Sequence, residues 1–292
     1  MAQKDFKSLD EQIAILKSRG LSIPDEAAAK QFLYHNNYYR VSGYSLTLRK
    51  HDVFAKSATF QNIVDIYDFD HELRHILLKY IEMIEVAVKS IYSYEFTKVH
   101  GATGYLDASN FSDPSKHAVI LSNAEMQKAR RLPHEAYLKH FVEELKQDVP
   151  LWAYVDLLTI SDISFLYSIS EPAIKTAVAS ALGITKQGAY LLGRFMHSMT
   201  IIRNLCAHGS RLYNRLFEQK PNLNKRELAL LRKDSAGTVD NAHLFGFVLI
   251  MRRLLSTEDF LSLKAEIIAL THKIPFVEMK YYGFPDNWQN LI

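Results

Sequence analysis

The stretch TFQNIVDIYDFDHELRHILLKYIEMIEVAVKSIYSYEF, from Thr59 to Phe96, contains no proline or glycine, and the next glycine is Gly101. Apolar side chains recur in it at three- and four-residue spacing, the pattern of a helix with one buried face. The run predicts one very long helix or two nearly collinear helices, and in either case the spine of the fold. The apolar positions are Ile63, Ile66, Leu73, Leu77, Tyr80, Ile84, Ala87 and Ile91.

Capping and breaker residues predict the helices around this spine. Ser8 and Glu11 form a capping box, so a first helix begins there and ends at Gly20. A second short helix follows Pro24 and runs to about His35, before an aromatic connector. Further helices are expected over 114–131, 159–169, 172–182 and 187–206, with a last pair within 240–272 that divides at 256–258, where Thr257 is a possible cap.

These elements predict an all-α fold, a helical bundle with an N-terminal helical and aromatic extension. Few breakers, many long apolar segments and no linker composition favour a single domain over residues 1–292. Within it we expect an N-terminal extension over 1–55 that packs on the body, a helical body over 56–272, and a C-terminal tail over 273–292.

The composition is that of a folded protein in a reducing compartment. Of the 292 residues, 48% are hydrophobic and 23% are charged, and the net charge of +3 is too small to indicate nucleic-acid binding by itself. The single cysteine, Cys206, excludes an intrachain disulfide. The N-terminus lacks the apolar segment of a signal peptide, and no apolar run reaches the roughly 18 residues of a membrane span. We therefore expect a cytoplasmic protein with no membrane partner.

The sequence HELRH at residues 71–75 matches H-E-x-x-H, which on a helix places two imidazoles one turn apart for zinc. Such a site needs a further ligand, which Glu95 could supply. However, Leu73 belongs to the buried face, and Arg74 beside a metal would be unfavourable. We therefore interpret the segment as a half-exposed helix face, and we expect no metal and no cofactor.

The sequence RNLCAHGSRLYNR, which begins at Arg203, carries the candidate chemistry. Asn204 and His208 are four residues apart and share one face of a helix, with Arg203 beside them. The segment is also typical of a plain helix C-terminus, in which Gly209 ends the helix and the basic groups meet its dipole. Cys206 and His208 point about 200° apart, so they do not form a thiol dyad, and Cys206 is interpreted as a core residue.

The wider sequence resembles a known family. R-N-x-x-x-H near the end of a long helix is the motif of the HEPN-domain ribonucleases. The chain is similar to the abortive-infection (Abi) branch of that superfamily, the Abi_2-type phage-resistance proteins. The resemblance extends over about residues 8 to 216 and rests on blocks in the family's order. These blocks are Gln12–Leu21, Asn37–Tyr44, Tyr67–Arg74, Ile84–Lys89, Arg203–His208 and Arg211–Arg215.

The resemblance implies an RNA-cleaving toxin of phage defence, a metal-independent endoribonuclease. RNA can be cut by its own 2′-OH, given a base, a proton donor and cations for the developing charge. His208 can act as base or acid at neutral pH, Arg203 can bind the phosphate, and Asn204 can orient either group. One histidine does not easily take both roles, and the resemblance implies a homodimer that brings two copies together. DNA lacks the 2′-OH and is not expected to be cut.

Two other functions remain open at this stage. One is a non-catalytic RNA-binding protein, because Abi-like proteins can be associated with small structured RNAs that would restrain the toxin. The other is a protein-interaction or antitoxin-like module in which the motif is buried for structure. Basic and aromatic side chains that could follow an RNA backbone are Arg40, Arg49, Lys50, Lys128, Arg130, Arg131, Arg211, Tyr213 and Arg215.

Overall fold

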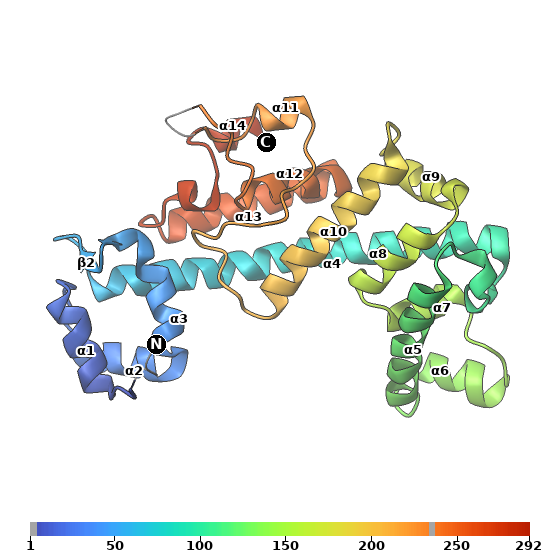
Figure 1. Ribbon diagram of the computed structural model, residues 1–292, viewed down its shortest axis with the longest axis horizontal. Helices are drawn as coiled ribbons and strands as arrows, with labels where there is room; N and C mark the ends of the chain where they lie inside the picture. The colour runs from blue at the N-terminus through green and yellow to red at the C-terminus, as the bar shows by residue number, and fades with distance from the viewer. Residues whose placement is uncertain (1–4, 234–236) are drawn as a thin grey trace.

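The computed structural model describes residues 5–233 and 237–292. A single helix of 41 residues, α4 (Phe60–His100), runs along the long axis of the molecule (Figure 1). It begins at a capping box between Thr59 and Asn62 and ends at Gly101, whose φ is 77°. Because no glycine or proline interrupts the hydrogen-bond ladder, the spine is one helix rather than two.

The other elements are arranged along α4 in three groups (Figure 1). The first group lies at the N-terminal end of α4 and consists of α1 (Leu9–Ser18), α2 (Glu26–Asn36), α3 (Tyr38–Ser42), η1 (Gly43–Leu48), β1 (Arg49–Lys50) and β2 (Val53–Phe54). The second lies at the opposite end and consists of η2 (Gly104–Leu106), η3 (Ala108–Asn110), α5 (Pro114–Arg131), α6 (Ala136–Lys139), η4 (His140–Glu144), α7 (Leu151–Tyr154), η5 (Val155–Leu157), α8 (Ile160–Ile169) and α9 (Pro172–Ala181). The third consists of α10 (Gly188–Ala207), α11 (Lys225–Leu228), α12 (Phe245–Leu254), α13 (Thr257–Lys273), η6 (Met279–Tyr282) and α14 (Trp288–Leu291).

The core lies between α4 and the helices that cross it. Helices α10, α13, α9 and α7 all pack on α4, and α10 also packs on α8, α9 and α12. In Figure 1, α10 crosses the middle of α4. The C-terminal end of α10 therefore lies beside the central turns of α4. The all-α class predicted from the sequence is confirmed. Each helix expected from capping and periodicity is present, within a few residues at its ends.

Two local features differ from expectation. A two-stranded antiparallel hairpin pairs β1 with β2, and its turn residues His51 and Asp52 both have positive φ. Strands of two residues are too short to show an alternating pattern, so the sequence did not reveal them. The cap of α13 is Ser256 and not Thr257, because the Ser256 hydroxyl accepts the Asp259 N–H at 3.0 Å.

The C-terminal residues form part of the core. Tyr282, Phe284 and Trp288 are all buried, and the Phe284 ring contacts the ring of Phe245 on α12. Among the described residues, no helix is long and apolar enough to cross a membrane.

Candidate functional site

The residues from Arg203 to Ala207 form the end of α10, and His208 is the capping residue that follows them. The side chains of Asn204 and His208 are exposed and that of Arg203 is half-buried. Within the described part of the chain, neither the Asn204 amide nor the His208 imidazole has a hydrogen-bond partner. The helix therefore presents an imidazole and an amide to solvent on the same side, and neither side chain is tied to another described residue.

The helix ends as the sequence predicted. Gly209 has a φ of 64°, its N–H donates to the Cys206 carbonyl at 3.1 Å, and the Ser210 N–H donates to the Leu205 carbonyl at 2.8 Å. These two bonds form a Schellman motif, which satisfies carbonyls at the end of a helix. The polar residues thus lie on a rigid, properly terminated helix end.

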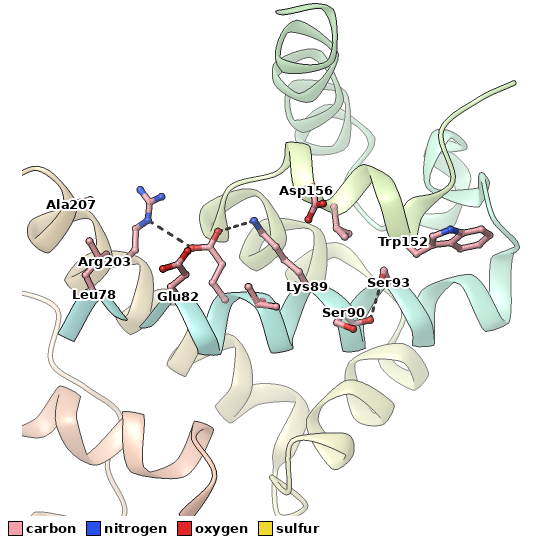
Figure 2. A pocket seen from close by; sticks show the side chains of 12 residues that line it. Leu78, Glu82, Lys89, Ser90, Ser93, Trp152, Asp156, Arg203 and Ala207 are labelled. Carbon is pink, nitrogen blue, oxygen red and sulfur yellow. Dashed lines mark hydrogen bonds and ion pairs between the residues drawn. The ribbon is translucent and has the colours of Figure 1, made fainter. Parts of the chain in front are cut away.

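A cavity of about 460 Å³ lies on the other side of Arg203, between α4, η5 and the end of α10 (Figure 2). The Arg203 Nε is 3.8 Å from Glu85 Oε2, and the Lys89 ammonium is 2.8 Å from Glu85 Oε1. In Figure 2 the dashed line of this ion pair leaves Arg203 at its Nε, and the two outer nitrogens of the guanidinium point away from that line. The carboxylate therefore orients the guanidinium without covering the edge that would meet a phosphate.

The charges around this cavity are mixed. Three carboxylates, Glu82, Glu85 and Asp156, line it together with the two cations Lys89 and Arg203. Ala207 also lines it, whereas His208 does not. Arg203 thus lies at the boundary between an acidic cavity and the exposed face that carries His208.

The loop after the motif is anchored by a buried carboxylate on α4. Asp70 is fully buried, and its Oδ1 accepts the backbone N–H of Tyr213 at 2.8 Å. The N–H of Leu212 lies 3.2 Å from both oxygens of Asp70. Arg74, one turn further along α4 and 3% exposed, pairs with Asp70 Oδ2. The carboxylate thereby fixes the loop against the middle of the spine.

Two tyrosines from distant parts of the chain complete this network. Tyr44 donates its hydroxyl to Asp70 Oδ2 at 2.9 Å, and Tyr282 donates to Oδ1 at 3.0 Å. Burial raises the pKa of both phenols, so they keep the protons that they donate. Burial also raises the pKa of Asp70, and the charge of Arg74 limits that rise. A carboxyl that accepts from all these donors has no position for a proton of its own, so the geometry is that of the ionised form.

Sequence reasoning assigned no role to Asp70, Arg74 or Glu85, although all three lie in blocks of the family resemblance. The sequence did contain a signal for the pairing of Asp70 with Arg74. Asp70 and Arg74 lie four residues apart among buried positions of the long helix, where an unpaired charge would be costly.

The predicted RNA contacts nearest the motif mostly hold its loop in place. Arg211 donates to the carbonyls of Tyr213 and Asn214, and Arg40 donates to the carbonyl of Gly209. Tyr213 is only 2% exposed and its hydroxyl is 2.6 Å from Thr47 Oγ1. Its ring is enclosed, so the predicted RNA contact at Tyr213 does not fit this structure.

The side chain of Arg215 also contacts the loop itself, because its Nη1 donates to the Arg211 carbonyl at 3.4 Å. The remaining predicted contacts lie elsewhere. Arg49 and Lys50 belong to the hairpin, where Arg49 pairs with Asp52 and Lys50 is exposed.

The other three cations lie near the end of α5. Lys128 pairs with Glu125 at 2.5 Å, while Arg130 is exposed. Arg131 pairs with Glu135 at 2.8 Å and donates to the Asp156 carbonyl at 2.8 Å, so it lies beside the acidic cavity. The nine predicted contacts therefore do not form one continuous surface around the motif.

The H-E-x-x-H sequence lies on the solvent side of α4. His71 and His75 are exposed, and their rings contact each other with centroids 4.4 Å apart. Among residues 5–233 and 237–292 no group of three or more histidine, cysteine, aspartate or glutamate side chains is arranged to hold a metal ion. The half-exposed helix face expected from the sequence is what the structure has.

Cys206 is buried in the core beside the motif, as predicted, at 6% exposure. Burial raises the pKa of its thiol to about 12. Iodoacetamide at about pH 8 is therefore expected to leave the native protein unmodified, because the thiolate fraction is about a thousandfold below that of a free thiol. The same reagent in urea is expected to add one carbamidomethyl group, measured by intact mass. Native modification as fast as that of glutathione would show that this helix end opens readily.

The fold and this site define a class: an all-α protein in which a buried aspartate–arginine pair on a long helix anchors the loop behind a polar helix end. The chain belongs to the Abi-like protein family, whose sequence model matches residues 31–214. The matched segment includes Asp70, Arg74, Glu85 and the whole motif, whereas Tyr282 lies outside it. No curated protein matches the chain. No solved structure matches it either.

Proposed function

We propose that this protein acts in abortive infection against phage, as a metal-independent endoribonuclease of the HEPN type. Membership of the Abi-like family supports the defence role. The cleavage activity rests on one observation: Asn204 and His208 are exposed on a firmly terminated helix end with no side-chain partner among the described residues, beside an arginine whose outer nitrogens point away from its carboxylate partner.

The proposed reaction uses the RNA's own 2′-OH as the nucleophile. The hydroxyl loses its proton to a base and attacks the adjacent phosphorus, and the bond from phosphorus to the 5′ oxygen breaks as that oxygen gains a proton. The products are a 2′,3′-cyclic phosphate and a 5′-OH end. His208 acts as base or acid, Arg203 binds the phosphate and its developing charge, and Asn204 orients the imidazole or the phosphate.

A second copy of the chain would supply the second imidazole. His208 lies on the exposed side of the helix end, outside the acidic cavity, so another molecule can approach it. A two-fold arrangement would bring two histidines and two arginines to one phosphate. A structured RNA bound across the same helix end would block this arrangement and restrain the toxin.

The residues predicted to contact RNA have different roles in this proposal. Lys50 and Arg130 are exposed cations that can meet a phosphate directly. Arg40 and Arg211 act instead by holding the loop that follows the motif. Tyr213 is left out because it is buried.

Binding of RNA without cleavage is the second candidate function. It is favoured by the acidic side chains Glu82 and Glu85, which line the cavity beside Arg203 and oppose the approach of a phosphate from that side. In that case the helix end would be a docking surface, and substitution of the motif would change affinity alone.

Replacing Arg203 with alanine tests the proposal. In EDTA the wild type is expected to cut RNA to 5′-OH products and to leave DNA intact, and R203A is expected to cut it about 10²- to 10³-fold more slowly. The matched control is Arg194→Ala, which removes an exposed arginine from the same helix and is expected to retain full activity. The measurement is the initial rate on a labelled oligoribonucleotide. RNA left intact by all three proteins would reject cleavage, and cleavage that stops in EDTA would reject the metal-free route.

A further inference from the structure

A second cavity, to which no role has been assigned so far, lies in the N-terminal extension. It has a volume of about 1080 Å³ and is bordered by α1, the end of α2, α3 and the turn of the hairpin. Aromatic side chains line it from two of these elements, with Tyr34 on α2 and Tyr38 and Tyr39 on α3. We call these three side chains and the cavity that they line the tyrosine groove.

Two of the three rings, those of Tyr34 and Tyr39, lie in water, whereas Tyr38 packs partly on the core. Tyr34 is 75% exposed, Tyr39 is 85% exposed, and the neighbouring Phe6 is 89% exposed. Asn37, with a φ of 61°, is the junction between α2 and α3, and its side chain accepts the Tyr39 N–H at 2.8 Å. Aromatic faces held open in this way offer stacking surfaces to a flat ligand.

Two polar atoms on residues that line the groove lack partners. Among the described residues, Gln12 Oε1 and Arg49 Nε are covered from solvent and neither has a hydrogen-bond partner. Gln12 is held by its Nε2, which donates to the Lys7 carbonyl at 2.8 Å, and Arg49 is held by its pairing with Asp52. Unsatisfied buried polar atoms are rare in folded proteins. Here they are one acceptor and one donor on residues that line the same groove as the open rings.

We propose that the tyrosine groove binds an unpaired nucleobase. A base has a flat face for Tyr34 or Tyr39, and its edge carries both a donor and an acceptor, which Gln12 Oε1 and Arg49 Nε can meet after a small side-chain adjustment. The charged side chains that line the groove are Lys7, Arg19 and Arg49 against Asp5 and Asp52, so cations outnumber carboxylates for the attached phosphate.

The groove is connected to the helix end of the candidate site. Arg40 follows Tyr39 on α3, and its guanidinium donates to the carbonyl of Gly209 and lies 5.5 Å from the centre of the Tyr67 ring. One short helix thus carries a groove tyrosine and a tether to the loop behind His208. The inference deepens the proposed function, because a base held at α3 would anchor an RNA strand that reaches the motif.

The test measures binding of a fluorescein-labelled single-stranded oligoribonucleotide by anisotropy, in a His208→Ala background so that cleavage does not interfere. Tyr34→Ala and Tyr39→Ala are each expected to weaken binding by at least about fivefold. Tyr39→Phe keeps the ring and is expected to bind like the background protein. Tyr94→Ala is the matched control, because Tyr94 is 67% exposed on α4 and does not line the groove.

Each outcome decides the inference independently of cleavage. Absence of RNA binding, equal binding by Y34A, Y39A and Y94A, or the same tyrosine dependence with an RNA duplex would overturn it. Titration with adenosine 5′-monophosphate separates the two sources of a base: tyrosine-dependent saturation assigns the groove to a free nucleotide as well, and its absence assigns the groove to a strand. Cleavage by the wild type together with groove variants that bind normally would retain the proposed function and reject this site alone.

Discussion

Replacing Asp70 with alanine is expected to lower the free energy of unfolding by about 3–5 kcal/mol. The substitution leaves the buried guanidinium of Arg74 without its counter-ion. It also removes the acceptor for the N–H groups of Leu212 and Tyr213, which no longer have a partner in the core. The loss is a large part of the roughly 5–15 kcal/mol that a folded domain usually has.

The measurement is urea unfolding followed by tryptophan fluorescence, with the full chain in each case. The matched control is Asp68→Ala, which removes an exposed carboxylate two residues away on the same helix and is expected to change stability by less than about 0.5 kcal/mol. Tyr282→Phe removes a single donor to Asp70 and is expected to cost about 1 kcal/mol. Equal stability of D70A and D68A would mean that this carboxylate does not hold the loop.

Replacing His208 with alanine is expected to slow RNA cleavage by about 10²- to 10⁴-fold, the usual contribution of a general acid or base. Folding should be unaffected, because the imidazole is exposed and makes no hydrogen bond within the described residues. In cells the same substitution is expected to relieve growth arrest and to leave RNA intact. The readouts are the single-turnover cleavage rate and the thermal midpoint of the purified protein.

The chain provides a close control for this experiment. His197 is an exposed histidine on α10, the helix that His208 caps, so His197→Ala removes the same kind of group nearby and is expected to retain cleavage. Mixing H208A with R203A tests whether two copies share a site, since recovery of activity in the mixture requires a complementing partner. Cleavage by H208A at the wild-type rate would remove His208 from the reaction.

Much of the fold was accessible from the sequence because it is coded locally. The uninterrupted run before Gly101 predicts the spine, and the capping residues Ser8, Thr159 and Asp113 begin helices where they stand. A cap acts on the N–H groups two or three residues away, so its signal lies within one helical turn. The hairpin and the cap at Ser256 were missed, because the first is too short for a pattern and the second competes with a neighbouring threonine.

Only part of the candidate site could be predicted from the sequence. The polar helix end could be predicted, because Asn204, His208 and Gly209 are neighbours along the chain. The surroundings of that helix end could not, because they are built from contacts across long sequence separations. Arg203 meets Glu85 of the spine, and Tyr213 turns inward to Thr47 rather than outward to solvent.

By itself, the sequence determined the all-α class, the long spine and the position of the polar motif at a helix end, since each depends on residues within a few turns of one another. The tertiary structure alone decided which distant groups satisfy the buried carboxylate of Asp70. Besides Arg74 one helical turn away, the carboxylate of Asp70 receives donors from residues 44, 212, 213 and 282, which no local pattern relates to it. A buried charge is stable only where such partners converge, and convergence is a property of packing rather than of spacing along the chain.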